Sequence, residues 1–207
     1  MPESKTWRNS PWGNVLILGV TTVVVLLVVW LVGFARDSSG QETTAESGAG
    51  QVSEVDVPDS DQPAPAVGEA APQFTATTLD GDEFDLADLG GEPAWLVFNA
   101  TWCSNCRAEI PDIQETYDAL GEQVQILSVY VSDSPTAVID YSKKLDLTFP
   151  QVIDSNNQIA ALYRVMGLPT HYFIAGDGTV NQVRVGTLSK AQINEALAQV
   201  GVGTIQQ

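Results

Sequence analysis

Basic residues are scarce in this chain of 207 residues, which has nine Lys and Arg against 26 Asp and Glu and a formal net charge of −17. Non-specific nucleic-acid binding and electrostatic attachment to anionic lipid both need clustered cations. The composition therefore argues against both functions, and we expect no nucleic-acid partner. The length suits one domain of ordinary size with an additional segment attached.

Cysteine and histidine are also rare, with two Cys and one His in the whole chain. Two cysteines cannot form a disulfide scaffold or a four-thiolate zinc site. One imidazole excludes any site that is built on two or three. The composition still allows a reactive pair of cysteines, because Cys103 and Cys106 lie three positions apart.

Charged residues are absent from residues 15–35, a run of 21 residues rich in Val and Leu. A helix of that length is roughly 31 Å long, enough to cross the hydrocarbon core of a bilayer. We predict a transmembrane anchor here that contacts the lipid bilayer. A cleaved signal peptide is the alternative, since Gly33-Phe34-Ala35 offers a cleavage site. The run is, however, longer than the usual signal core of about 7–15 residues.

The orientation of this anchor rests on few charges, because Lys5 and Arg8 precede the run and Arg36 follows it. The positive-inside rule therefore gives only a small bias. The simpler topology leaves residues 1–14 as a cytoplasmic tail and exports the remainder. We predict a single-pass protein of the cell membrane, with its N-terminus inside and its C-terminal domain extracytoplasmic.

Aromatic residues and bases are both absent from residues 37–72, a stretch of 36 residues that contains eight acids. Such a segment buries too little apolar area to offset the entropy lost on ordering. We predict an acidic, disordered tether over residues 36–72, with a typical reach of roughly 35 Å. Either it is a simple spacer, or it lets a catalytic domain sweep the space above the membrane.

Residues 73–207 alternate short apolar runs with amphipathic segments, which indicates an α/β domain. The run AWLVFN at residues 94–99 is suited to a buried central strand. Further strands are expected at 74–78, 83–86, 124–131, 150–153, 171–175 and 180–185, and helices at 104–120, 135–145, 158–163 and 189–200.

The cysteine pair stands in the sequence Trp102-Cys103-Ser104-Asn105-Cys106, where the central strand passes to a helix. This spacing puts both sulfurs in the first helical turn, within reach of a disulfide. Cys103 is expected at the helix start, where free N–H groups and the helix dipole favour a thiolate. Cys106 is expected to be more buried and to attack a mixed disulfide formed on Cys103. A static structural disulfide is the alternative.

Three motifs carry a family resemblance: residues 71–89 (APQFTATTLDGDEFDLADL), residues 99–111 (NATWCSNCRAEIP), and residues 167–170 (GLPT). Together they resemble the TlpA/ResA-like thioredoxin-fold oxidoreductases, which are membrane-anchored, extracytoplasmic thiol–disulfide proteins. The second motif is the most specific, because it fills the family pattern W-C-x-x-C-x-x-E-x-P. The resemblance extends from residue 71 to the expected C-terminal helix.

The resemblance implies a thioredoxin-like α/β fold, a central mixed sheet flanked by helices, behind one N-terminal transmembrane helix. It further implies an enzyme that exchanges disulfides with protein clients, as a reductase that can serve cytochrome c maturation. A membrane-embedded thiol transporter would supply electrons, and no cofactor would be needed beyond the redox-active disulfide Cys103–Cys106. The dipeptide Ser104-Asn105 departs from the Pro-containing dipeptides common in the family, which leaves the redox potential and the direction of exchange open.

Glu109 is the candidate acid–base group, because it lies one helical turn after Cys106 on the same face. A partly desolvated carboxylate has a raised pKa and could exchange protons with the thiol. In thioredoxins a buried aspartate on the central strand has that role, but the matching residue here is Val97. The resemblance assigns the role to Glu109. The alternative is that Glu109 only solvates an exposed helix face.

The resemblance also places Trp102, Leu168 and Pro169 at the client-binding surface. Pro169 resembles the cis-proline that faces the disulfide in this fold, and the Leu168 backbone would then pair with a bound client strand. Trp102 could shield the sulfurs and offer a flat docking surface, or it could serve packing alone. For His171 a structural or surface position is favoured over a position beside the site.

Two other functions compete with this prediction. A copper-binding assembly factor could use Cys103, Cys106 and His171, since soft thiolates suit Cu(I). Copper chaperones of this fold resemble C-x-x-x-C, however, which is one residue longer than the spacing here. A peroxiredoxin function is less favoured still, because Thr101 stands two rather than three residues before Cys103.

Overall fold

The computed structural model describes residues 22–27, 53–57 and 64–204, and the structural statements below concern these residues. The chain divides into two compact units, Met1–Gly48 and Ala49–Gln207. The strands and helices of the second unit are β1 (Val55–Asp56), β2 (Thr75–Thr77), β3 (Glu83–Asp85), β4 (Ala94–Asn99), α2 (Ser104–Leu120), β5 (Gln125–Val131), α3 (Pro135–Leu145), β6 (Gln151–Asp154), α4 (Gln158–Leu162), β7 (Thr170–Ile174), β8 (Val180–Val185) and α5 (Lys190–Gln199).

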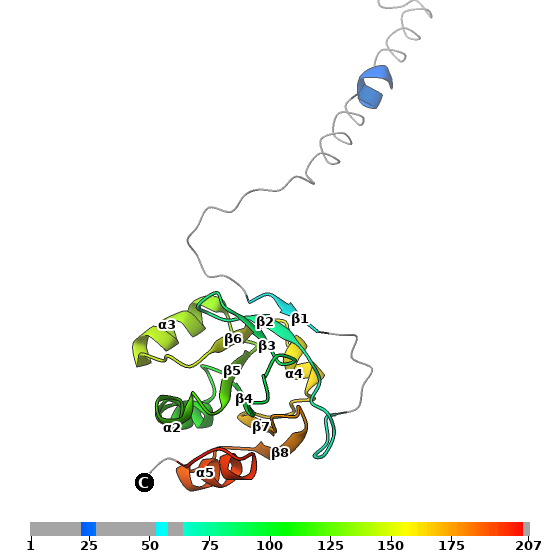
Figure 1. Cartoon of the computed structure of the whole chain (residues 1–207). Coiled ribbons are helices and arrows are strands. Elements are labelled where there is room, and N and C mark those ends of the chain that lie inside the picture. The colour runs from blue at the N-terminus through cyan, green and yellow to red at the C-terminus, as the bar shows by residue number, and fades with distance from the viewer. Residues whose placement is uncertain (1–21, 28–52, 58–63, 205–207) are drawn as a thin grey trace, which may run out of the picture. The chain divides into compact units, whose positions relative to one another are not determined.

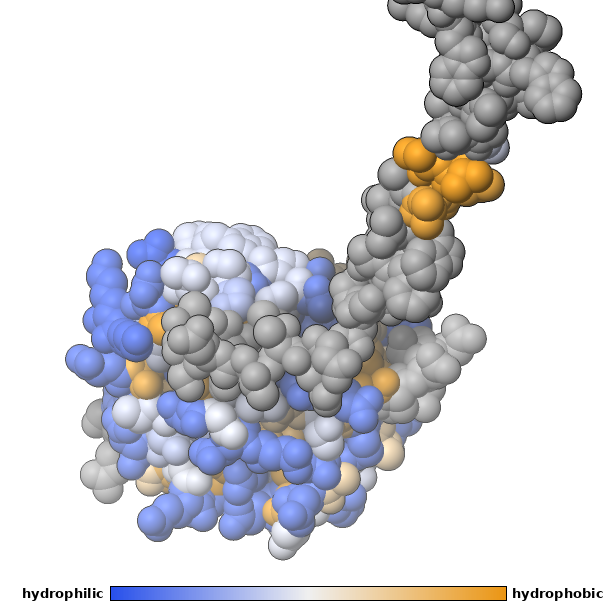
Figure 2. Space-filling view, turned by 90° about the horizontal axis from the view of Figure 1, so that it is seen from above, coloured by the Kyte–Doolittle hydropathy of each residue, from blue (hydrophilic) through white to orange (hydrophobic). Residues whose placement is uncertain are grey.

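In the first unit the structure describes residues 22–27, which are helical. The side chains of residues 23–27 are all Val or Leu and all exposed, as the orange atoms in Figure 2 show. Within the described residues, no helix combines the length and apolar character that crossing a bilayer requires. The rest of the predicted anchor at 15–35, and the predicted tail at 1–14, lie outside the described residues. The transmembrane topology therefore stays a prediction.

A five-stranded mixed sheet in the order β6–β5–β4–β7–β8 forms the centre of the second unit (Figure 1). Its middle strand β4 is parallel to β5 and antiparallel to β7, and β5 is parallel to β6. This arrangement confirms the predicted thioredoxin-like α/β architecture. Every predicted strand and helix of the domain is present, and each end lies within one residue of its predicted position.

The central strand β4 is buried along its whole length because both faces of the sheet are covered. Trp95 and Val97 point to the face where they pack with Ile110 of α2 and Ile193 of α5. Leu96 and its neighbours on the other face pack against α4 and the small sheet β1–β2–β3. A strand that is buried on both faces has a continuous run of apolar residues. This is why the strand at residues 94–99 could be predicted from the sequence.

Helices α2 and α5 each begin after a residue whose side chain caps the helix. Cys103 is the N-cap of α2, and its Sγ accepts a hydrogen bond from the Cys106 N–H at 3.2 Å. Ser189 is the N-cap of α5 and forms a reciprocal capping box with Gln192. These caps fix where each helix begins, because they satisfy backbone N–H groups that have no partner within the helix.

The folded domain begins upstream of residue 73, which differs from the predicted tether at residues 36–72. Val55–Asp56 pairs with β2 as an added antiparallel strand, and the Ser53 hydroxyl accepts a hydrogen bond from the Ile153 N–H at 3.0 Å. Ala71 is buried and donates its N–H to the Gly178 carbonyl at 2.9 Å. Composition did not reveal the pairing of Val55–Asp56 with β2 because backbone hydrogen bonds require no particular side chain. Residues 36–52 and 58–63 of the predicted tether lie outside the described ranges.

Gly176, at the turn between β7 and β8, has no room for a side chain. A Cβ there would overlap the Gly91 carbonyl oxygen and lie 2.7 Å from the Gly91 carbonyl carbon. We expect Gly176→Ala to lower the free energy of unfolding by about 1–3 kcal/mol, because one backbone must move away from the other. Urea denaturation would measure this loss.

Gly167→Ala is the matched control for Gly176→Ala, because a Cβ at residue 167 would meet only Val185 Cγ1, at 3.8 Å. We expect this control to change the free energy of unfolding by less than about 0.5 kcal/mol. Equal losses in the two variants would contradict the assignment of the Gly176 effect to backbone overlap.

Candidate active site

The two cysteines form a disulfide at the junction between β4 and α2. Their Cα atoms are 5.3 Å apart, and the sulfur atoms are bonded. Cys103 has extended backbone angles as the N-cap, whereas Cys106 lies within the first turn of the helix. The predicted placement of both sulfurs in one helical turn is therefore confirmed, and Cys103 lies where unpaired N–H groups and the helix dipole favour a thiolate.

Exposure distinguishes the two sulfur-bearing residues. Cys103 is partly exposed, whereas Cys106 is 2% exposed and belongs to the buried face of α2. Of the two residues, Cys103 is therefore the one open to solvent. This asymmetry matches the roles expected for a nucleophile and for a thiol that resolves the mixed disulfide.

Glu109 is fully buried one helical turn after Cys106, so the alternative of an exposed, solvating Glu109 is wrong. Its Oε1 accepts a hydrogen bond from the Leu188 N–H at 2.9 Å. Burial raises the pKa of Glu109 to about 7, with a small addition from nearby Asp112, and the Leu188 hydrogen bond only partly offsets this. A carboxyl group that titrates near neutral pH is suited to accept and return a proton.

His171 is also fully buried, so the possibility of a surface position is wrong. It lies on β7 directly opposite Val97 of β4, and its Nε2 is 3.4 Å from Glu109 Oε2. Burial lowers the pKa of His171 to about 4, which keeps the ring neutral at neutral pH. Val97 thus replaces the aspartate that thioredoxins have, while its cross-strand neighbour is the only histidine of the chain.

The Leu168–Pro169 peptide bond is cis, as the family resemblance implied. Pro169 is buried and its carbonyl accepts a hydrogen bond from the Gly186 N–H at 2.8 Å. Leu168 is partly exposed and, within the described part of the chain, has no backbone hydrogen bond of its own. Its N–H and carbonyl groups are therefore available to an added strand, as predicted for client binding.

An open pocket of about 510 Å³ lies beside the disulfide. Its lining comes from three segments: residues 102–105 at the start of α2, residues 131–132 at the end of β5, and residues 165–168 before the cis-proline. Its full lining is Trp102, Cys103, Ser104, Asn105, Val131, Ser132, Val165, Met166, Gly167 and Leu168. The pocket brings the predicted binding residues Trp102 and Leu168 together with the nucleophilic cysteine.

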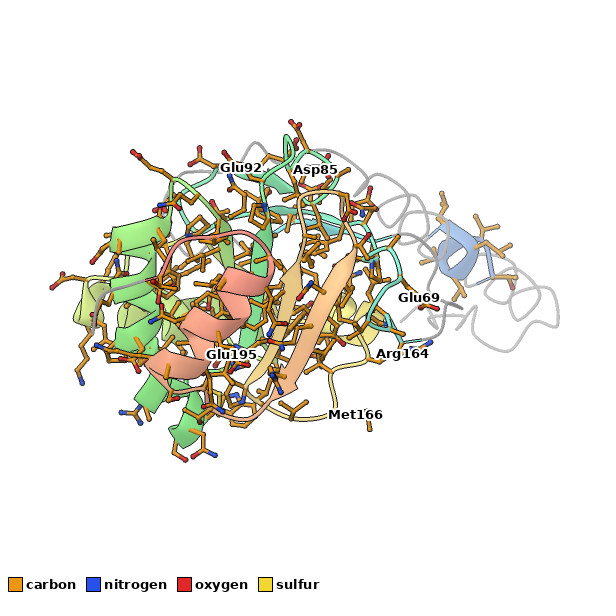
Figure 3. The ribbon with its side chains drawn as sticks, turned by 60° about the horizontal axis from the view of Figure 1, so that its bottom comes forward. Glu69, Asp85, Glu92, Arg164, Met166 and Glu195 are labelled. Atoms are coloured by element: carbon orange, nitrogen blue, oxygen red, sulfur yellow. A yellow bond between two sulfur atoms is a disulfide. The ribbon has the colours of Figure 1, made fainter. Side chains whose placement is uncertain are left out.

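Two large apolar side chains of this pocket are open to solvent. Trp102 is 65% exposed, which argues against a purely packing role, and Met166 is 96% exposed. Figure 3 shows Met166 on the loop before β7, with its side chain pointing away from the domain. Sequence reasoning missed Met166, although its position three residues before Pro169 was a usable signal.

Asp133 supports the active-site turn and was also missed. Its carboxylate accepts hydrogen bonds from the Thr101 N–H at 2.7 Å and from the Thr101 hydroxyl at 2.8 Å. Thr101 immediately precedes Trp102, so these bonds fix the chain where it leaves β4 for the cysteines. Thr101 and Asp133 are 32 residues apart, and no local sequence pattern connects them.

The copper alternative finds no support in the geometry. Across residues 22–27, 53–57 and 64–204, no group of three or more His, Cys, Asp or Glu side chains is placed to hold a metal ion. The structure therefore does not assemble Cys103, Cys106 and His171 as a ligand set. Instead, His171 lies beside the carboxyl group of Glu109.

The sequence profile of the AhpC/TSA family matches residues 67–183, more than half of the chain and including both cysteines. The chain belongs to the AhpC/TSA family. Among curated proteins, the thiol-disulfide oxidoreductase ResA of Geobacillus kaustophilus is 38% identical over 136 residues, which cover 65% of this chain and 78% of the relative. The TlpA/ResA-like resemblance drawn from the motifs is therefore confirmed.

Two solved structures extend this relationship. A thiol:disulfide interchange protein of the thioredoxin family from Chlorobium tepidum is 29% identical with a TM-score of 0.59, over 66% of this chain and 99% of that one. StoA from Bacillus subtilis is 26% identical with a TM-score of 0.56, over 61% of this chain and 96% of that one. With its own disulfide at the N-terminus of α2, this AhpC/TSA member is a thiol–disulfide oxidoreductase of the ResA/DsbE/StoA type.

Proposed function

We propose that the protein is a membrane-anchored, extracytoplasmic reductase of protein disulfides, with Cys103 and Cys106 as its redox centre and no other cofactor. The observation that carries the chemistry is the disulfide at the α2 N-terminus, with one sulfur-bearing residue partly exposed and the other buried. The uncharged run at residues 15–35 supports the anchor. ResA is similar over the catalytic domain, which supports the reaction class.

The reaction begins with the reduced protein. The Cys103 thiolate attacks one sulfur of a client disulfide, which forms a Cys103–client bond and releases the other client sulfur as a thiolate. Glu109 then accepts the proton of the Cys106 thiol, and Cys106 attacks Cys103. This step forms the Cys103–Cys106 disulfide and releases the second client sulfur. The client gains two electrons, the protein is oxidised by two electrons, and the two client thiolates take up one proton returned by Glu109 and one from solvent.

Client recognition is proposed for the pocket beside Cys103. Trp102 and Met166 present exposed apolar surface in the pocket that Cys103 also lines, and Leu168 offers unpaired backbone groups there. An extended segment of the client could pair with Leu168 and place its cysteine at Cys103. Apocytochrome c is a candidate client, and a membrane thiol transporter is the candidate electron donor, both from the family resemblance.

Cys106→Ser provides the test, because it leaves Cys103 as the single thiol of the chain and removes the resolving sulfur. We expect mixed disulfides with client proteins to accumulate in the membrane fraction of cells that express this variant. Non-reducing electrophoresis followed by mass spectrometry would identify them. The double variant Cys103→Ser/Cys106→Ser is the control and should form no adduct.

The same variant tests the topology. A membrane-impermeant maleimide added to intact protoplasts or spheroplasts should label Cys103 of Cys106→Ser, because the proposal places the domain outside the cytoplasmic membrane. Labelling only after lysis would overturn the extracytoplasmic location. Labelling without client adducts would instead contradict the proposed action on protein disulfides.

A further inference from the structure

Two ionisable groups, one on α2 and one on β7, lie together in the core of the domain. Glu109 comes from α2 and His171 comes from β7, and both side chains are 0% exposed. The distance between Glu109 Oε2 and His171 Nε2 is 3.4 Å. The disulfide chemistry described above uses Glu109 but gives no function to His171.

The polar atoms of this pair are incompletely satisfied. Glu109 Oε1 accepts the Leu188 N–H, whereas Oε2 forms no hydrogen bond of good geometry in the described part of the chain. Neither nitrogen of His171 forms one there either, although the Gly186 backbone lies close enough to favour the protonated ring. Buried polar groups are normally hydrogen-bonded, so an unsatisfied pair of this kind requires an explanation.

The position of the imidazole is fixed by its neighbours. His171 lies on β7, between β4 and β8 in the sheet, and its ring packs beside those of Trp95, at a centroid distance of 6.0 Å, and Phe173, at 6.5 Å. A fully buried ring that packs beside two aromatic rings cannot turn away from Glu109 without disturbing the core. The group that is free to adjust is therefore the Glu109 carboxyl.

We propose that His171 is a positioning residue for Glu109: the imidazole carries its hydrogen on Nε2 and donates it to Glu109 Oε2 when the carboxyl is ionised. This inference rests on the proposed role of Glu109 as proton acceptor for Cys106. Together with the Leu188 N–H, the imidazole gives each carboxylate oxygen one donor. The carboxylate is thereby held on the buried face of α2, one turn from Cys106.

We expect the 3.4 Å contact to shorten to a hydrogen bond when Glu109 is ionised. Hydrogen bonds to an ionised acceptor are shorter and stronger than neutral ones. In the disulfide form no thiol needs deprotonation, and the carboxyl can stay neutral at a longer distance. When Glu109 is ionised the contact shortens, and when it accepts the Cys106 proton the contact lengthens again. A neutral imidazole therefore stabilises the base without adding a charge to the core.

The other charged groups around the pair lie at the surface. Asp112 follows Glu109 on α2 and forms an ion pair with Lys190 at the start of α5, with an Nζ–Oδ1 distance of 3.7 Å. Arg184 is opposite His171 in the β7–β8 ladder, but it is exposed. The test therefore keeps Asp112, Lys190 and Arg184 unchanged, so that only the imidazole differs between variants.

The test is a ¹³C NMR titration of the Glu109 carboxyl carbon in the oxidised full-length protein, in wild type, His171→Phe and His171→Gln. Phenylalanine keeps a ring but has no donor, whereas glutamine keeps an N–H near the position of Nε2. We expect the midpoint in His171→Phe to rise by about one pH unit, because one hydrogen bond to the carboxylate is lost. His171→Gln should stay close to wild type, and an unchanged midpoint in His171→Phe would overturn the proposal.

A measurement on the wild type avoids any loss of folding in the variants. ¹⁵N NMR of the single histidine at pH 7 should show a neutral ring that is protonated on Nε2. A ring protonated on Nδ1, with Nε2 bare, would overturn the proposal. Neither measurement depends on turnover, so they still decide the inference if Glu109 proves not to be the catalytic base.

Discussion

Replacing Cys103 with serine is expected to abolish disulfide reduction, because a hydroxyl group does not attack a disulfide at neutral pH. The structure makes Cys103 the only cysteine that a client can reach, since Cys106 is 2% exposed. Serine is a favourable N-cap, so the start of α2 should be preserved. We expect the rate of insulin reduction, with dithiothreitol as the electron source, to fall more than about a thousandfold, to the uncatalysed level.

Cys106→Ser gives the contrasting result in this assay. It should react once through Cys103 and then stop as a mixed disulfide, because no second thiol can resolve it. Circular dichroism of both variants would show that the fold is intact. Residual turnover by Cys103→Ser above about one hundredth of the wild-type rate would show that Cys106 can act as a nucleophile, contrary to its burial.

Replacing Glu109 with glutamine is expected to slow the attack of Cys106 on a mixed disulfide by about a hundredfold at pH 7, the lower range for general-base catalysis. Reduced protein mixed with a chromogenic aromatic disulfide should release one thiolate quickly and the second more slowly. Stopped-flow absorbance of the second phase reports the step that needs Glu109. Glu115→Gln, an exposed position on the same helix, is the matched control and should behave as wild type.

The rate of this second phase is expected to change with pH in a direction that the pKa of Glu109 determines. The pKa of Glu109 is raised to about 7 because the side chain is buried. The carboxylate that accepts the proton forms as the pH rises through 7, so the wild-type rate should rise up to that pH and then flatten. Glu109→Gln should lose this inflection. A variant that keeps the wild-type profile would exclude Glu109 as the base.

Stability gives an independent measure of the same group. Between pH 4.5 and about 7 the native state retains a proton on Glu109 that the unfolded chain has lost, so this carboxyl makes wild-type stability fall as the pH rises. Glu109→Gln removes that contribution. We therefore expect the unfolding free energy of the variant, relative to wild type, to rise by about 3 kcal/mol across this window and to level off above it.

Local sequence patterns account for most of the domain. The central strand at residues 94–99 was predictable because both of its faces are buried, and the helix at 104–120 because its apolar residues recur on one face. Gly176-Asp177-Gly178 stands between two short apolar runs, a pattern typical of a hairpin, and the β7–β8 hairpin turns there. The two-residue strand Val55–Asp56 was not predictable, since its pairing with β2 uses backbone groups rather than a side-chain pattern.

The features of the candidate site can likewise be divided into those that the sequence predicts and those that it does not. Cys103, Cys106 and Glu109 are within seven residues of one another, so helical spacing alone places them on successive turns. The family motif adds Trp102, Leu168 and Pro169 by resemblance. Neither route indicates how buried the carboxyl of Glu109 is, and its pKa depends on that burial.

The sequence by itself determined the redox chemistry of this protein, because two cysteines at a helix start need only local geometry to react. Only the tertiary structure decided the surroundings of that pair. Leu188 donates to Glu109 from 79 residues away, and Asp133 accepts from Thr101 across 32 residues. His171 reaches Glu109 only because β7 pairs beside the central strand. Such contacts arise when sheet pairing and helix packing bring distant segments together, and burial at those contacts sets the pKa values.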